Sequence, residues 1–172
     1  MSLKLITTLL FLYFMSGNST GSDFYPEKTA ERLIKKALKN KNISIIDRLE
    51  ITETNVKKEP IVVYKIIDIS SSDHFRFAVF TQAKGRYDFF DYLVIVSDNG
   101  MVEIVDVVKY RSEHGGEIAS KKWLRQFENY SEGELKYGTD ISAISGATLS
   151  AKSVTHDIPI VIQLMKNSIL AE

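Results

Sequence analysis

The chain of 172 residues contains no cysteine. This absence excludes disulfides, thiolate metal sites, a cysteine nucleophile and a lipid-modified cysteine behind an export signal. A redox function would therefore depend on a bound cofactor. The length and an apolar content of 44% allow one folded domain that is stabilised by its core alone.

Net charge is also absent, because 22 Lys and Arg residues balance 22 Asp and Glu residues. The balance gives no support for a nucleic acid or an anionic membrane as partner. Short basic clusters, such as Lys35-Lys36 and Lys39 to Lys41, are interpreted as solvated faces. The three histidines are too scattered for a zinc motif, and we expect no metal site.

Long apolar runs are scarce, and the one near the N-terminus has a recognisable pattern. Lys4 precedes an uncharged run from Leu5 to Met15, and small residues follow up to Ser22. This pattern is typical of a signal peptide, and the run is shorter than the ~20 residues that cross a bilayer. We expect residues 1–22 to be a signal peptide, or alternatively an uncleaved membrane segment. The domain of residues 23–172 would then be periplasmic or otherwise extracytoplasmic.

The spacing of apolar residues predicts the elements of this domain. A helix is expected from about Pro26 to Asn40, and β-branched and aromatic residues predict strands at 61–69, 75–82, 90–97 and 101–110. Asn99-Gly100 predicts a hairpin between the last two strands. A short helix is expected from Ser120, as N-cap, to about Asn129.

The last helix begins near the sequence Ser-Gly-Ala-Thr, and Pro159 is expected to kink or restart it. Its apolar residues form one stripe: Leu149, Val154, Ile158, Val161, Ile162, Met165 and Ile169. The fold class is therefore α+β, a single domain with an antiparallel β-meander packed against helices.

The turn Ser145-Gly146-Ala147-Thr148 is the strongest candidate site. A helix N-terminus attracts anions such as phosphate, small residues let an anion approach the backbone, and the two hydroxyls are donors. The same residue types also form ordinary helix caps, so physical chemistry alone leaves both interpretations open.

Residues 145–150, Ser-Gly-Ala-Thr-Leu-Ser, resemble the motif of the FMN-binding domain family. This family includes the flavin-carrying small subunits of ion-pumping membrane reductases and many small exported flavoproteins. The upstream segment "YRSEHGGEIASKKWLRQF" and the hairpin before it also resemble the family, so the likeness covers roughly residues 84–166.

The resemblance implies FMN attached to Thr148 through a phosphoester that a dedicated flavin transferase makes. Ser145, Gly146 and Ala147 would hold the phosphate, and Ser150 would support the turn. A loop that contains His114, Gly115, Gly116 and Glu117 would border the flavin, and the alternative is that this loop is a plain turn.

Other residues leave alternatives open. The family usually has Asp three residues before the motif serine, whereas this chain has Ser142, with Asp140 the nearest acid; noncovalent FMN is therefore the alternative to the phosphoester. Trp123 could stack on a flavin, but its apolar neighbours favour a place in the core. His156 and Asp157 are adjacent on a helix and would not face each other, which argues against a general base.

These observations predict a small exported flavoprotein that carries electrons between redox partner proteins, membrane reductases among the candidates. No catalytic residue is expected, because no substrate site is evident. One alternative is a binding or interaction module of the same fold that has lost covalent FMN. A weaker alternative is an enzyme that reduces a small acceptor.

Overall fold

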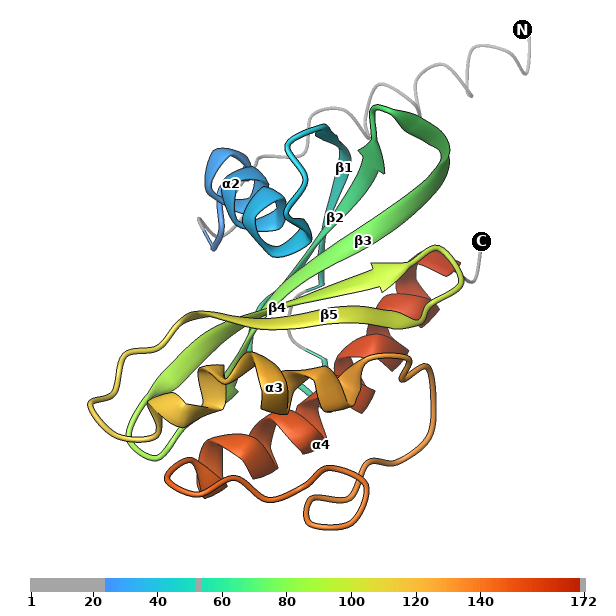
Figure 1. Cartoon of the computed structure of the whole chain (residues 1–172). Coiled ribbons are helices and arrows are strands. Elements are labelled where there is room, and N and C mark those ends of the chain that lie inside the picture. The colour runs from blue at the N-terminus through green and yellow to red at the C-terminus, as the bar shows by residue number, and fades with distance from the viewer. Residues whose placement is uncertain (1–23, 52–53, 171–172) are drawn as a thin grey trace, which may run out of the picture.

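The computed structural model describes residues 24–51 and 54–170, so the expected N-terminal export segment lies outside the described residues (Figure 1). One helix comes first, α2 (Glu27–Leu38). Five strands follow: β1 (Ile43–Ile51), β2 (Ile61–Asp68), β3 (Ser71–Lys84), β4 (Phe89–Ser97) and β5 (Val102–Lys109). The short α3 (Lys121–Leu124) and the long α4 (Thr148–Met165) complete the domain.

The five strands form one sheet in the order β1-β2-β3-β4-β5, and every pairing is antiparallel. The expected α+β class, with a meander and a C-terminal helix, is confirmed. The four expected strands are present, and β3 is longer than 75–82. β1 was not expected from the sequence. Much of it is exposed, and a bulge between Ile45 and Asp47 interrupts its alternation, which removes the usual signal of a strand.

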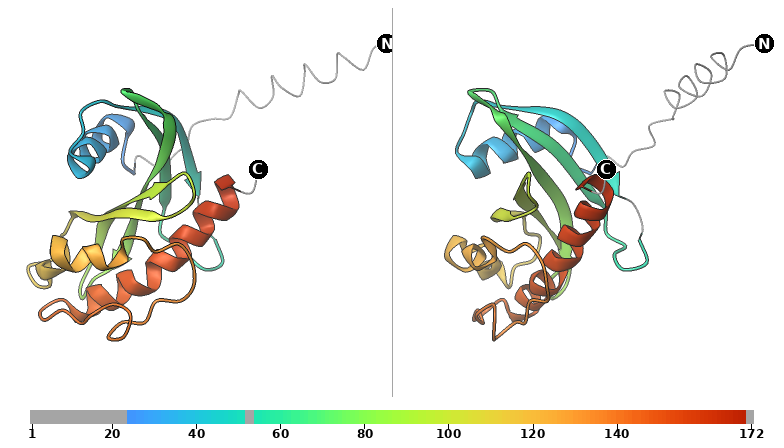
Figure 2. Two further views of the ribbon diagram at one scale, coloured as in Figure 1. Left: turned by 45° about the vertical axis from the view of Figure 1, so that its right-hand side comes forward. Right: turned by 90° about the vertical axis from the view of Figure 1, so that its right-hand side faces the viewer.

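Each face of the sheet is covered by helices, and this divides the core in two (Figures 1 and 2). The larger core packs α3 and α4 against one face, with Trp123, Phe127 and Val154 among its buried residues. The smaller core packs Ala30 and Ile34 of α2 against the opposite face. α2 and α4 therefore lie on opposite sides of the sheet.

β5 contributes apolar residues to both cores, but its regular alternation between the two faces is interrupted. Val102 and Val105 belong to the larger core, whereas Ile104 packs against the smaller one. The pairing with β4 shifts between Ile95 and Val96. Because a bulge inserts one extra residue, it moves the following side chains to the other face.

α4 runs through Pro159 as one helix, so of the expected kink or restart at this proline the restart does not occur (Figure 2). Val154 and Ile158 before the proline, and Val161 and Ile162 after it, are buried in the same core. This shared packing outweighs the hydrogen bond that proline cannot donate. Leu149 is not part of the buried stripe, because it is 55% exposed.

The segment expected to be one helix from Ser120 to Asn129 consists of short turns. A 3-10 turn, Gly116–Ala119, precedes α3, and another, Arg125–Phe127, follows it. Ser120 occupies the N-cap of α3, but its hydroxyl makes no capping hydrogen bond. Burial of Trp123, Leu124 and Phe127 holds the segment in place instead.

Candidate functional site

A pocket of about 180 Å³ lies at the start of α4, and we call it the Thr148 pocket. Three parts of the chain meet there: the β3–β4 turn, the loop after β5 and the first turn of α4. Its lining residues are Arg86, Tyr110, His114, Gly115, Gly146, Ala147, Thr148, Leu149 and Ser150.

The helix start that lines this pocket has no side-chain cap. Ala147 is the N-cap residue, and the first hydrogen bond of the helix runs from the Ala151 N–H to the Ala147 carbonyl at 2.9 Å. The N–H groups of the preceding residues, Thr148 to Ser150, therefore have no carbonyl partner in the helix. Alanine is a poor N-cap, so the ordinary-cap interpretation of this turn does not hold.

The preceding turn requires glycine at position 146. Gly146 has φ +83°, a conformation that other residues adopt only with strain. A Cβ at this position would come within 2.6 Å of the Glu117 carboxyl carbon. Glu117 thus lies against the motif turn, although it is not in the pocket lining.

Tyr110 joins the loop after β5 to α4. Its hydroxyl donates to the His114 carbonyl at 2.7 Å and lies 3.3 Å from the Ser150 Oγ. Gly115 has φ +90°, and a Cβ there would come within 2.5 Å of the Tyr110 hydroxyl. The loop and the helix are therefore held together by one aromatic side chain.

Arg86 brings a positive charge to the pocket, and it was not among the residues expected at the site. It lies in the β3–β4 turn, where the Gly85 N–H donates to the Asp88 carbonyl at 2.8 Å. The Lys84 N–H donates to the Ser153 Oγ at 3.1 Å and fastens this turn to α4. The only sequence signal was a glycine and a charge between two predicted strands.

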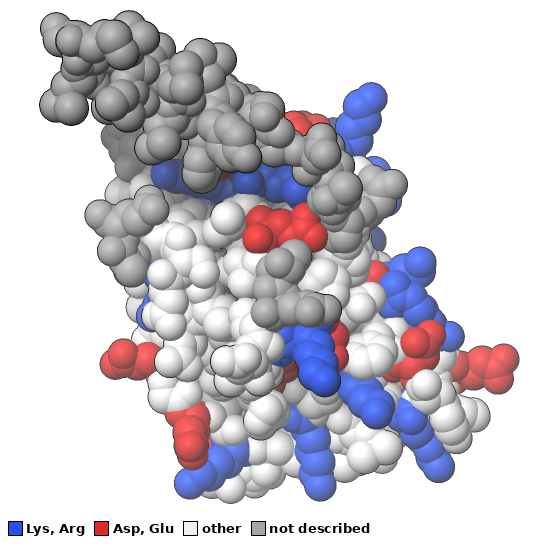
Figure 3. All heavy atoms as spheres, turned by 180° about the vertical axis from the view of Figure 1, so that it is seen from behind, with Lys and Arg blue, Asp and Glu red and all other residues white. Residues whose placement is uncertain are grey.

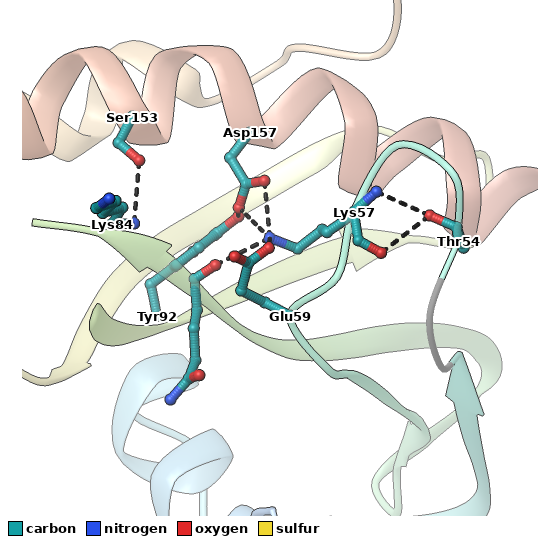
Figure 4. A network of polar contacts seen from close by, with 8 residues as sticks. Thr54, Lys57, Glu59, Lys84, Tyr92, Ser153 and Asp157 are labelled. Atoms are coloured by element: carbon teal, nitrogen blue, oxygen red, sulfur yellow. Dashed lines mark hydrogen bonds and ion pairs between the residues drawn. The ribbon is translucent and has the colours of Figure 1, made fainter. Parts of the chain in front are cut away.

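A buried polar network fixes α4 further along its length (Figure 4). The Lys57 ammonium donates to both carboxylate oxygens of Asp157 at 2.8 Å, and to the Gln82 carbonyl at 2.9 Å. The Tyr92 hydroxyl donates to Asp157 at 2.5 Å. Helix α4 is thus joined to the β1–β2 connection and to the sheet. His156 is exposed, so His156 and Asp157 do not form a pair.

The environment of this network shifts two pKa values. Burial raises the pKa of Asp157, although the Lys57 ammonium opposes the shift. Burial and the neighbouring Asp157 carboxylate raise the pKa of Tyr92 well above its usual value. Tyr92 therefore remains a neutral hydrogen-bond donor.

A second buried acid, Asp91 on β4, lies on the α2 face. Its carboxylate accepts two hydrogen bonds from the Arg111 guanidinium at 2.7 and 2.8 Å, and one each from Tyr25 and Gln82 at 2.7 Å. Burial favours a higher pKa for Asp91, but these donors outweigh it and lower the pKa. The cluster fastens the start of α2 to the sheet.

The remaining expected site residues are more dispersed. Ser145 and Gly116 are exposed and do not line the pocket. Ser142 is exposed as well, and its backbone carbonyl accepts the Trp123 Nε1–H at 2.7 Å. Trp123 is 6% exposed, which confirms its place in the core.

Within residues 24–51 and 54–170, no helix has the length and apolar character needed to cross a membrane. A scan against protein-family models returns no match for this chain, and a search of curated proteins finds no similar sequence.

Proposed function

We propose that the protein binds FMN at the Thr148 pocket and serves as an exported electron carrier. One observation carries the proposal: the motif turn Gly146–Ser150 and the His114-Gly115 loop, which are distant in the sequence, line a single pocket. Both segments belong to the stretches that resemble the FMN-binding domain family.

The residues of the pocket fit the phosphate of FMN. The uncapped N–H groups of the first α4 turn can donate to phosphate oxygens, and the Arg86 guanidinium can neutralise its charge. Gly146 and Ala147 leave the backbone open to close approach. The pocket volume of about 180 Å³ lies below the usual range of ~300–1,000 Å³ for ligand pockets, so it suits the phosphate end of FMN rather than the whole cofactor.

When bound, FMN would supply the electron-transfer chemistry, because a chain without cysteine has no thiol redox couple. The chain would place the phosphate at the helix start, and Tyr110 would hold the bordering loop in position. Thr148 is exposed, so its hydroxyl is accessible to a flavin transferase.

Ser142 affects the covalent attachment of FMN to Thr148 rather than the binding of FMN in the pocket. Its side chain is exposed and does not line the pocket, so replacing the usual aspartate leaves the phosphate-binding groups unchanged. The substitution would therefore affect recognition by a transferase, and noncovalent FMN is the alternative form of the same site.

One observation favours a second function, an interaction module without flavin. The Glu117 carboxylate lies against Gly146 and places negative charge beside the turn that would hold a phosphate. Repulsion between the two anions would weaken FMN binding unless Arg86 compensates.

The test is the intact mass and visible spectrum of the full chain, co-produced with a flavin transferase and measured before and after denaturation. We expect a mass increase of one FMN less one water, lost in Thr148→Val and retained in the control Thr139→Val, which changes an exposed threonine outside the pocket. Yellow colour that is released on denaturation would indicate noncovalent FMN. A colourless protein of unmodified mass would refute the flavoprotein proposal and favour the interaction module.

A further inference from the structure

The outer face of α2 carries a continuous row of basic side chains, which we call the α2 basic stripe. Its members recur every three or four residues, the spacing that places side chains on one helix face. They are Lys28, Arg32, Lys35, Lys36 and Lys39. In the sequence they form separate short clusters, and only the helix aligns them.

The stripe is largely exposed and held in a fixed orientation. Four of its members are exposed, and Lys35 is paired with Glu31 in the same helix. The opposite side of α2 buries Ala30 and Ile34 in the smaller core. Tyr25, just before the helix, donates to Asp91 and stacks on Phe80 at 4.7 Å between ring centroids. The helix therefore presents the basic stripe as a rigid ridge.

One further basic residue, Lys109, lies near the stripe, while α2 itself carries two acids, Glu27 and the Lys35-paired Glu31. Arg32 and Lys109 line a shallow hollow between α2 and β5. The carboxylate in that hollow, Asp91, is already neutralised by Arg111. By contrast, basic and acidic side chains are interspersed on the face seen in Figure 3. Because the whole chain has no net charge, the stripe is a local excess that calls for an anionic partner.

We propose that the α2 basic stripe docks on the surface of an anionic lipid bilayer. A straight helical ridge suits a planar array of anionic headgroups, which attract basic side chains close to the surface, while the apolar face of α2 stays in the smaller core. The position in the chain also fits. Only residues 16–26 separate α2 from the apolar run Leu5–Met15, and they span at most about 40 Å. If that run enters the membrane, α2 stays within reach of the lipid surface.

Docking through α2 has a consequence for the site. α2 and α4 cover opposite faces of the sheet, so the α4 face would point away from the lipid (Figure 2). A soluble partner could then approach that face while the domain remains on the bilayer. The docking proposal does not depend on FMN, and it fails or holds independently of the flavin.

The absence of cysteine allows a direct test with the full chain, because a single introduced cysteine carries a unique fluorophore. The reporter is Asn42→Cys, an exposed position just after α2, and Thr139→Cys is the control reporter on an exposed loop before α4. Each labelled chain is mixed with vesicles that contain a headgroup-attached quencher. The vesicles are phosphatidylcholine alone, or phosphatidylcholine with phosphatidylglycerol.

We expect quenching of the Asn42 reporter only on vesicles with phosphatidylglycerol, and its loss at about 1 M salt, where screening acts within about 3 Å. The Lys28→Gln, Arg32→Gln, Lys36→Gln triple variant should dock roughly a hundredfold less. The matched triple Lys122→Gln, Arg125→Gln, Lys136→Gln removes three exposed basic charges elsewhere and should dock normally. Equal quenching on both vesicles, or equal loss in both triples, would overturn the proposal.

Discussion

The two long helices both begin without a side-chain cap, yet their starts are used differently. At α2 the N-cap is Pro26, which borders a shallow hollow together with Tyr25, and Tyr25 bonds to Asp91 and stacks on Phe80. At α4 the N-cap is Ala147, and the region opens into the Thr148 pocket. Both helix starts therefore border a hollow, but the residues that line the two hollows differ.

The residues around a helix start, and not the helix itself, therefore determine whether its free backbone N–H groups can bind a ligand. The hollow at the start of α2 is lined by aromatic rings and by Asp91, an acid that is already paired with Arg111. At the start of α4, glycine and alanine leave the backbone N–H groups accessible. We therefore expect substitutions near α2 to reduce stability, and substitutions near the α4 start to reduce binding.

The largest effect should follow from Asp91→Ala, which leaves the Arg111 guanidinium, Tyr25 and Gln82 without their shared acceptor. Losing this ion pair, in which Asp91 is buried and Arg111 is partly exposed, together with two further hydrogen bonds should lower the free energy of unfolding by about 4 kcal/mol. Denaturant titration followed by circular dichroism measures the loss. Tyr25→Phe should cost less, and the exposed Tyr87→Phe should cost almost nothing. A loss below about 1 kcal/mol for Asp91→Ala, well under the cost of breaking a buried pair, would mean that α2 is held mainly by its apolar face.

The same cluster should make stability depend on pH. Because the pKa of Asp91 is lowered in the folded protein, its contribution is present above the ordinary aspartate pKa of about 3.9. It is lost as the pH falls through the lowered folded value. The difference in unfolding free energy between the native chain and Asp91→Asn should therefore be constant near neutral pH and shrink below about pH 4. A difference that stays unchanged down to about pH 2 would contradict this assignment.

On the α4 face, Lys57→Met should cost about 3 kcal/mol, because it leaves the Asp157 carboxylate buried without its cation. Lys58→Met is the matched control, since the neighbouring lysine is exposed. The double variant Lys57→Met, Asp157→Leu should recover part of the loss. Thermal and denaturant unfolding would report all three, and equal costs for Lys57→Met and Lys58→Met would show that the ion pair contributes nothing.

The smallest effect on stability, about 1–2 kcal/mol, is expected for Gly146→Ala, which forces alanine to a positive φ. Gly138→Ala is the control, because Gly138 has φ +87° but open space where a Cβ would lie. Any cost of Gly146→Ala above that of Gly138→Ala measures the contact with Glu117. Flavin binding, followed by fluorescence, should fall only for Gly146→Ala. Equal flavin binding by both variants would show that the Gly146 turn does not contribute to the binding site.

Much of the fold could be predicted from the sequence, because alternation and helical spacing are local signals. The four strands from Ile61 to Lys109 and both long helices follow from them. β1 could not be found in this way, because its exposed residues and its bulge at Ile45 leave no regular period. The passage of α4 through Pro159 depends on distant packing, which local spacing does not contain.

The residues of the candidate site were likewise only partly predictable from the sequence. The motif identified Gly146 to Ser150 because small residues and hydroxyls are visible in the sequence. Arg86 joins them only through the pairing of β3 with β4 and the contact of their turn with α4. Lys57 and Asp157 meet although they are 100 residues apart in the sequence. Asp91 did leave one signal, an acid within the apolar strand Phe89–Ser97, but its partners come from three other segments.

The meander gives the domain a definite order of assembly. Each strand pairs with the next in the sequence, so the sheet can grow by successive hairpins, each closing only a short loop. α4 docks across a much longer stretch of chain, because its ion pair from Asp157 reaches back to Lys57. We therefore expect the helix to settle last, and the Thr148 pocket, which needs α4 beside two finished hairpins, to be the final part of the molecule to form.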